Sequence, residues 1–322
     1  MAGAFALRPE DEMPCAPAAR QQSADPAAAV HAILSVPDDE LDYACAKLAL
    51  DRIVDPSIDV QATMVELHRM AGIARELAGP SATDGAKLAA LRKLIYESGP
   101  WNDHRPFGYD HSDPHGQHLP RKLLHNYLAG RLGQCVSMPI LFLILADWMG
   151  LRVALASAPE HIFVRYTDGL GRTINLETTS GAHPARDVWY RHCFLVNDRA
   201  IESGLYMRTL SRREGAALMA TTVAEHLRAQ GRYEEVIAVC ETILEHDRRA
   251  GAVMVMQGSA YGVLLHQEFE RQYPLPFLIP EQLRARRLRL IERNNSLISA
   301  AEALGWSCGE FDSKEEGRSY VH

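Results

Sequence analysis

Residues 133–150 of the chain, GQCVSMPILFLILADWMG, decide the architecture of its middle part. Almost every side chain from 136 to 149 is apolar, and a helix that is apolar on all sides has to be buried. Gly150 suits the left-handed conformation that commonly ends a helix. Pro139 has no backbone N–H, which a helix tolerates only near its start. We therefore expect a buried helix over residues 136–149 that begins next to Cys135.

Three short strands are expected after this helix, which makes the middle of the chain α+β. Their sequences are VALA (153–156), HIFVRY (161–166) and RTINLE (172–177). The last two are joined by a turn signal at 168–171, Asp-Gly-Leu-Gly, which predicts a hairpin.

The register of this hairpin decides which side chains meet. With a three-residue loop, Asp168–Leu170, Glu177 lies directly opposite His161. Opposed residues share one face of the sheet, with their Cβ atoms about 5 Å apart. A slip by one residue would bring Thr178 opposite His161 instead.

The flanking regions are predicted to be mostly helical. We expect a disordered leader at 1–25, a helical lead-in at 26–98, the α+β core at 99–205, a helical region at 206–310 and a solvated tail at 311–322. In the lead-in, Asp38–Glu40 favours a helix start and Pro56 a helix end. Asp59 can cap a second helix, and a third is expected from Asp84.

Cys135 is the candidate nucleophile. At a helix start the unpaired N–H groups and the helix dipole favour a thiolate over a thiol. The same N–H groups can stabilise an oxyanion, and the neighbouring Gln134 is a candidate for that role. The alternative is a buried structural cysteine, which is what most free cysteines are.

His161 and Glu177 are the candidate partners of that thiol. A helix, a turn and a return strand separate Cys135 from His161, which can bring both residues to one end of the core. The histidine would take the thiol proton and later deliver it to the leaving group, while Glu177 would orient the imidazole. Asn175, on the same face, is a second candidate for the orienting role. The alternatives are a strand-end histidine and a strand-edge carboxylate without catalytic roles.

The motifs GQCVSMPILFLILADWMGLRV, APEHIFVRY and INLETTSG resemble the transglutaminase-like superfamily, which has a papain-like Cys-His-acid core. More specifically, they resemble its bacterial SirB1-related branch, and LALDRIVDPSIDVQATMVELHRM is similar to the helical lead-in of that branch. The resemblance covers about residues 41–200. It implies a buried helix against a small antiparallel sheet, with Cys135, His161 and Glu177 as nucleophile, base and acid.

The chemistry that this resemblance implies is acyl transfer from an amide through a thioester. With water as acceptor, the protein would be a thiol protease or amidase acting on a peptide or protein substrate, which is the leading hypothesis. The rival is a non-catalytic protein-interaction or regulatory protein, because the usual acid is aspartate and many SirB1 relatives lack the cysteine. A protein-glutamine transglutaminase is the third hypothesis. None of the three requires a cofactor.

The segment from LRAQGRYEEV to GSAYGVLL resembles a degenerate tetratricopeptide repeat. Gly231, Tyr233 and Leu244 occupy repeat positions, and Gly258 and Tyr261 would begin the next unit. Such helices could bind a protein partner. They could equally pack against the core, and with fewer than three repeats we favour this structural role.

The stretch 99–120 is predicted to be a long irregular loop, which compact domains usually keep for a purpose. It is rich in histidine, with HSDPHGQH at 111–118, but its Pro and Gly residues exclude helical ligand spacing, and we expect no metal site. The histidines of the loop region are His104, His111, His115, His118 and His125. Trp101 and Tyr109 could line a substrate groove or anchor the loop to the core.

Composition excludes some classes of protein. The net charge of −7 without a basic stripe argues against nucleic acid as a partner. No apolar run of about 18 residues is present, which argues against a membrane span. The six cysteines lack paired CxxC spacing and predict reduced thiols, and with no secretory signal we expect a cytoplasmic protein.

Overall fold

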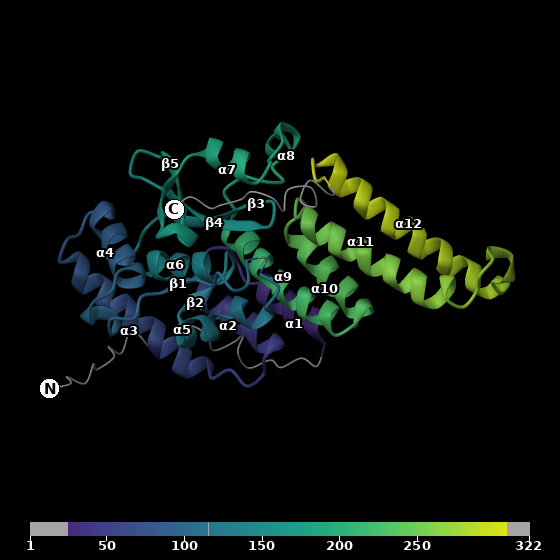
Figure 1. The fold of residues 1–322 in the computed structure, drawn as a ribbon, viewed down its shortest axis with the longest axis horizontal. Coiled ribbons are helices and arrows are strands. Elements are labelled where there is room, and N and C mark those ends of the chain that lie inside the picture. The colour runs from purple at the N-terminus through teal and green to yellow at the C-terminus, as the bar shows by residue number, and fades with distance from the viewer. Residues whose placement is uncertain (1–24, 115, 308–322) are drawn as a thin grey trace.

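The computed structural model describes residues 25–114 and 116–307, which form a mixed helix and sheet structure compatible with the α+β class (Figure 1). The leader predicted at 1–25, except Asp25, and the tail predicted at 311–322 lie outside the described residues. The α-helices are α1 (Pro26–Leu34), α2 (Tyr43–Val54), α3 (Val60–Ala78), α4 (Asp84–Tyr96), α5 (Leu124–Gly130), α6 (Ser137–Trp148), α7 (Asp187–Cys193), α8 (Asp198–Glu202), α9 (Arg212–Ala229), α10 (Tyr233–His246), α11 (Gly251–Leu265) and α12 (Glu281–Ala303). The strands are β1 (Gly108–Tyr109), β2 (Leu132–Gly133), β3 (Val153–Ala158), β4 (His161–Thr167), β5 (Thr173–Glu177) and β6 (His183–Ala185). Short 3₁₀ turns cover Pro100–Asn102, Leu119–Lys122, Thr178–Ser180 and Pro276–Leu278, and a π-helical turn covers His266–Glu270.

Strands β3 to β6 form an antiparallel sheet in the order β3-β4-β5-β6, and β1 pairs with β2 in parallel. The predicted strands are present within one or two residues of their expected bounds, whereas β6 was not predicted. Its sequence, His-Pro-Ala, lacks the β-branched residues by which a strand is usually recognised.

Helix α6 is the buried helix predicted from the sequence. All side chains from Ser137 to Ala146 are buried, and Gly150 has a positive φ of 72° just after the helix. Helix α6 packs on one face of the sheet through β3 and β4, and α7 and α8 lie on the other face (Figure 1). A second, smaller apolar cluster, which includes Phe163 and Tyr190, fills the space on that other face.

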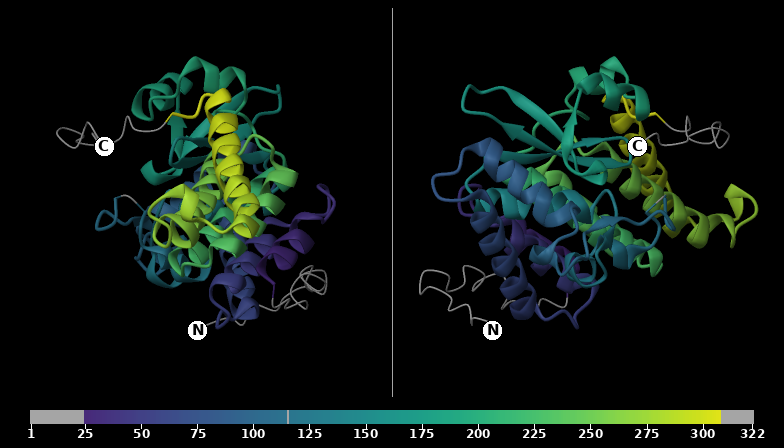
Figure 2. Two further views of the ribbon diagram at one scale, coloured as in Figure 1. Left: turned by 90° about the vertical axis from the view of Figure 1, so that its right-hand side faces the viewer. Right: turned by 60° about the vertical axis from the view of Figure 1, so that its left-hand side comes forward.

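The C-terminal helices complete the main core rather than forming a core of their own. One cluster of buried apolar side chains runs from α1 to α12, with α9 packed on α2 and α10 packed on α1. Helix α12 packs mainly on α11, and the two extend away from the sheet (Figures 1 and 2). Gly231, at φ 73°, lies in the turn between α9 and α10, and Tyr233 begins α10.

Helix starts in the lead-in follow local capping chemistry. Asp59 accepts a hydrogen bond from Ala62 N–H and caps α3, as predicted, and α4 begins at Asp84. The first predicted start, Asp38–Glu40, is wrong, because α2 begins after Asp42, whose carboxylate accepts from Cys45 N–H. Several acidic residues in a row offer alternative caps, and the packing of Leu41 and Tyr43 into the core fixes the later one.

The predicted register of the β4–β5 hairpin is also wrong, by two residues. Thr167 pairs with Thr173 and Val164 with Leu176, so that the loop has five residues, Asp168–Arg172. The Asp168 carboxylate stabilises this longer loop by accepting the N–H groups of Leu170 and Arg172. A shift of two residues keeps every side chain on its original face, so that Glu177 still lies on the same face as His161.

The expectation of reduced thiols does not hold for every cysteine. Cys135 and Cys240 are free thiols, but Cys45 is disulfide-bonded. Spacing along the sequence does not report which cysteines are close in the fold.

Candidate active site

Cys135 lies just ahead of helix α6 and is half-buried. The parallel bridge between β1 and β2, in which Tyr109 pairs with Gly133, holds the segment that leads into it. The first backbone hydrogen bond of α6 runs from Met138 N–H to the Gln134 carbonyl. The N–H groups of Cys135, Val136 and Ser137 therefore precede the first intrahelical bond, as at any helix N-terminus.

The turn between β3 and β4 brings a second backbone group to the thiol. Cys135 Sγ lies 3.5 Å from the Glu160 carbonyl oxygen. Pro159 followed by Glu160 at φ 55° has the pattern of a type II turn, a conformation that a non-glycine residue adopts at some cost. This turn makes His161 the first residue of β4, directly after the Glu160 carbonyl that Cys135 contacts.

His161 and Glu177 form a buried pair. His161 Nε2 lies 2.8 Å from Glu177 Oε2, and both side chains are almost fully buried. The Cys135 side chain is close enough to His161 to raise the pKa of the imidazole. Because Nε2 is engaged by the carboxylate, Nδ1 is the ring nitrogen left for the thiol. The structure therefore brings the three predicted side chains together in the order thiol, imidazole, carboxylate.

Glu177 is held by four hydrogen bonds. Its Oε1 accepts from Thr179 N–H at 3.0 Å and from Thr179 Oγ1 at 2.6 Å. Its Oε2 accepts from the Tyr190 hydroxyl at 2.9 Å in addition to His161. A buried carboxylate is tolerated only when its oxygens are satisfied in this way.

The electrostatics of the pair favour its charged form. Burial alone would lower the pKa of His161, but the Glu177 carboxylate and the hydrogen bond with Cys135 outweigh it and raise that pKa to about 9. Burial would likewise raise the pKa of Glu177, but His161 and Thr179 hold it below its usual value. The imidazole of His161 is therefore a cation at neutral pH.

Aromatic rings fix the plane of the imidazole. Phe194 stacks on His161 with ring centroids 4.5 Å apart and planes 15° from parallel. Trp189, on the exposed side of α7, meets Phe194 edge-on at 5.8 Å. The imidazole therefore has little freedom to rotate away from the thiol.

Gln134 is fully buried, but its side-chain amide does not point a free donor at the thiol. Its Nε2 donates to both the carbonyl and the carboxylate of Asp113, at 2.9 and 3.0 Å. A role for this side chain in an oxyanion site would require those bonds to break. The N–H groups at the start of α6 are better placed donors.

Trp101 anchors the loop instead of facing Cys135. Its indole N–H donates to the carbonyls of Lys93 and Glu97 in and after α4, and the Lys93 ammonium lies 4.3 Å from its ring centroid. Tyr109 lies in β1 and is nearer to Cys135 in sequence than Trp101 is. Its hydroxyl donates to the Pro114 carbonyl. Trp101 was expected either to line a substrate groove or to anchor the loop to the core, and its contacts support the anchoring role.

Asn175 does not orient the imidazole. Its side chain accepts from Arg165 Nε at 2.9 Å and donates to the Asp187 carboxylate at 2.6 Å. The amide therefore links β4 to the start of α7, away from His161 Nε2.

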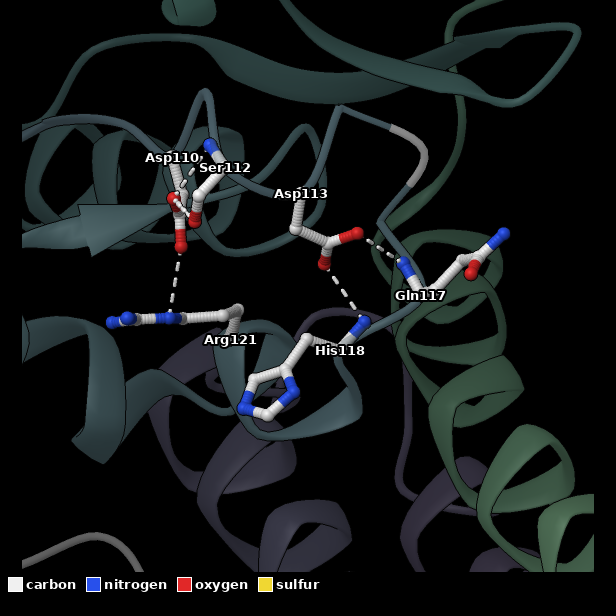
Figure 3. A pocket seen from close by; sticks show the side chains of 6 residues that line it. All are labelled: Asp110, Ser112, Asp113, Gln117, His118 and Arg121. Atoms are coloured by element: carbon white, nitrogen blue, oxygen red, sulfur yellow. Dashed lines mark hydrogen bonds and ion pairs between the residues drawn. The ribbon is translucent and has the colours of Figure 1, made fainter.

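The histidine-rich loop contains an open pocket of about 480 Å³ that includes none of the three clustered residues (Figure 3). It is lined by Asp110, Ser112, Asp113, Gln117, His118 and Arg121. The Asp110 carboxylate is bonded to Ser112 and Arg121, and the Asp113 carboxylate accepts two backbone N–H groups (Figure 3). Within the described parts of the chain, which exclude His115, no group of three His, Cys, Asp or Glu side chains could hold a metal ion.

Three contributors to the site were missed by the sequence reasoning. Thr179 could have been found from the sequence. A carboxylate that accepts the backbone N–H two residues later, as Glu177 does from Thr179, is a common turn motif. Tyr190 and Phe194 come from α7, and no local pattern links them to His161. Their contacts depend on how α7 packs on the sheet.

No family model matches the chain, and neither the curated proteins nor the solved structures contain a match to it. In the residues that the structure describes, no helix is both long and apolar enough to cross a membrane.

Proposed function

We propose that the protein is a thiol-dependent acyl-transfer enzyme of the transglutaminase-like kind, which hydrolyses a peptide or amide bond through a thioester on Cys135. The observation that carries the proposal is the buried His161–Glu177 pair at 2.8 Å, next to a half-exposed cysteine that acts on the imidazole. An accessible nucleophile, a base and a group that orients the base are the three parts that this chemistry needs.

In the first half-reaction, the Cys135 thiolate attacks the carbonyl carbon of the amide and forms a C–S bond. The oxygen of the tetrahedral intermediate becomes negative, and the N–H groups at the start of α6 can stabilise it. The His161 imidazolium gives its proton to the amide nitrogen as the C–N bond breaks, and the amine leaves. Cys135 is then a thioester and His161 is neutral.

In the second half-reaction, neutral His161 takes a proton from water, whose oxygen attacks the thioester carbonyl. The C–S bond breaks, a carboxylic acid leaves, and the thiolate–imidazolium pair is restored. Glu177 stabilises the imidazolium in both half-reactions but does not exchange protons. Water is the simplest acceptor, since no feature of the described residues marks an amine-binding site.

An activated ester tests this proposal before the natural substrate is known. With p-nitrophenyl acetate, we expect a burst of nitrophenolate equal to the enzyme concentration, an acetylated Cys135 in the mass spectrum, and slower turnover. Cys135→Ala should lose the burst and retain its fold by circular dichroism. A burst that survives in Cys135→Ala, or no acetylation of Cys135 in the wild type, would refute the proposal.

A second candidate, a non-catalytic interaction protein, is favoured by one observation. Helices α11 and α12 extend away from the sheet, and their connection exposes Phe277 and Leu278, which are 72% and 52% accessible. If interaction is the function, Cys135→Ala will retain partner binding and cellular phenotype. Loss of the phenotype in Cys135→Ala, with partner binding intact, would exclude this candidate.

A further inference from the structure

The glutamate of the proposed triad receives a second donor on the same oxygen that faces the histidine. The Tyr190 hydroxyl lies 2.9 Å from Glu177 Oε2, and His161 Nε2 lies 2.8 Å from that oxygen. Tyr190 comes from α7, whereas His161 and Glu177 come from neighbouring strands. Glu177 Oε2 thus links Tyr190, in helix α7, to the His161 imidazole through two hydrogen bonds.

The Tyr190 side chain is rigid. It is fully buried, and its ring stacks on Phe163 with centroids 4.0 Å apart. Burial and the neighbouring Glu177 carboxylate raise the pKa of Tyr190, so that its hydroxyl remains protonated and is a permanent donor. A fixed ring with a permanent O–H can hold an acceptor in one place.

The remaining charged neighbours of Tyr190 are engaged with each other. Arg165 on β4 and Asp187 at the start of α7 act on Tyr190 through their charges, and they form an ion pair at 3.6 Å. Among the residues that the structure describes, the donors to the other oxygen of Glu177, Oε1, are the N–H and the hydroxyl of Thr179. Within the same part of the chain, the hydrogen bonds to Oε2 come from Tyr190 and His161, so that each carboxylate oxygen has its own donors.

We propose that Tyr190 is a positioning residue for acyl transfer at Cys135. Its hydroxyl fixes Glu177 Oε2, so that the imidazole keeps Nε2 on the carboxylate and presents Nδ1 to the thiol. This inference rests on the proposed function, and it extends the triad to a fourth side chain that does not touch the reacting atoms.

Tyr190→Phe is the direct test, because phenylalanine retains the ring that stacks on Phe163 and removes only the hydroxyl. Tyr127→Phe is the matched control. Tyr127 is equally buried, and its hydroxyl has no hydrogen-bond partner among the described residues. Both variants should fold, and circular dichroism and thermal unfolding will verify this.

Two measurements separate positioning from a structural role. The first is the rate of iodoacetamide alkylation of Cys135 at pH 7, with the site assigned by mass spectrometry. We expect this rate to fall about fivefold in Tyr190→Phe and to remain unchanged in Tyr127→Phe. The second is the proton NMR signal of the His161 Nε2–H, which should be far downfield and protected in the wild type and broadened in Tyr190→Phe.

The possible outcomes distinguish this inference from the proposed function. If wild-type Cys135 is alkylated no faster than in the urea-unfolded chain, the proposed function fails and the inference falls with it. If wild-type Cys135 is activated and Tyr190→Phe matches it in rate and NMR signal, only the inference is overturned. Equal losses in Tyr190→Phe and Tyr127→Phe would also overturn it, because the effect would then be structural.

Discussion

Among the described residues, the pairs Lys47–Asp51 and His161–Glu177 are buried ion pairs of similar length, and they differ in what lies next to them. Lys47 and Asp51, both in α2, are 2.6 Å apart and almost fully buried. Lys47 also donates to the Lys122 carbonyl, and Asp51 accepts from Leu124 N–H, so that every contact holds α2 against the start of α5. No nucleophile takes part in these contacts.

The pair of His161 and Glu177 is buried to the same degree but ends at a half-exposed thiol. Its cation is an imidazole, a group that ordinarily gains and loses a proton near neutral pH. Burial and charge pairing therefore do not mark a functional site by themselves. What distinguishes the second pair is a titratable base in contact with an accessible nucleophile.

The largest effect on stability is expected from breaking the structural pair. Lys47→Met leaves the Asp51 carboxylate buried without its cation, which should lower the free energy of unfolding by about 3 kcal/mol or more. Urea unfolding would measure it. Lys122→Met is the matched control: it breaks a partly exposed bridge to Glu225 and should cost less than about 1 kcal/mol. Equal losses in both variants would show that the Lys47–Asp51 pair is not the anchor we describe.

Breaking the second pair should affect reactivity more than stability. His161→Gln keeps a polar side chain of similar size but cannot act as a base, and we expect acylation by p-nitrophenyl acetate to slow about 100-fold at pH 7. Stopped-flow measurement of the nitrophenolate burst gives this rate. A His161→Gln variant that acylates at the wild-type rate would place His161 with Lys47 as a purely structural residue.

The pH dependence of stability provides a smaller effect with a definite sign. The pKa of His161 is about 9 in the folded protein and 6.5 for an exposed histidine, so the folded state binds the proton more tightly. This contribution is complete below pH 6.5 and disappears as the pH rises through 9. We expect the free energy of unfolding to fall by about 2 kcal/mol between pH 7.5 and 9.5, as measured by urea titrations. The fall should be absent in His161→Gln, and its persistence there would assign it to another group.

The smallest effect is expected at the loop anchor. Trp101→Phe removes the indole N–H that donates to Lys93 and Glu97, which should cost about 1 kcal/mol of stability. Alkylation of Cys135 should not change. If alkylation or ester turnover falls while the stability is unaltered, Trp101 lines the substrate groove after all.

The sequence was sufficient to predict the parts of the site that local patterns encode. The apolar run after Cys135 predicted α6, and two short segments joined by a turn signal predicted β4 and β5. The predicted hairpin register was wrong, yet the face of Glu177 was correct, because side chains repeat every two residues and the error was two. Glu177 is offset by two residues from the position directly opposite His161, and the long glutamate side chain suits this diagonal arrangement.

What could not be predicted depends on contacts between distant elements. Tyr190 reaches Glu177 only because α7 packs across the sheet, and Phe194 stacks on His161 for the same reason. Gln134 was predicted as an oxyanion donor from its position beside Cys135, but its amide is bonded to Asp113 in the preceding loop. A residue's neighbours in sequence do not reveal which acceptor its side chain will find in the fold.

The most direct test of the account is the pH dependence of Cys135 alkylation in the wild type and in His161→Gln, with the modified site identified by mass spectrometry. We expect wild-type Cys135 to be alkylated faster near neutral pH than Cys135 in His161→Gln and in the urea-unfolded chain, with a rate profile that differs between the two folded proteins. Identical profiles in the two proteins, matching that of Cys135 in the urea-unfolded chain, would contradict the existence of an activated Cys-His-Glu site.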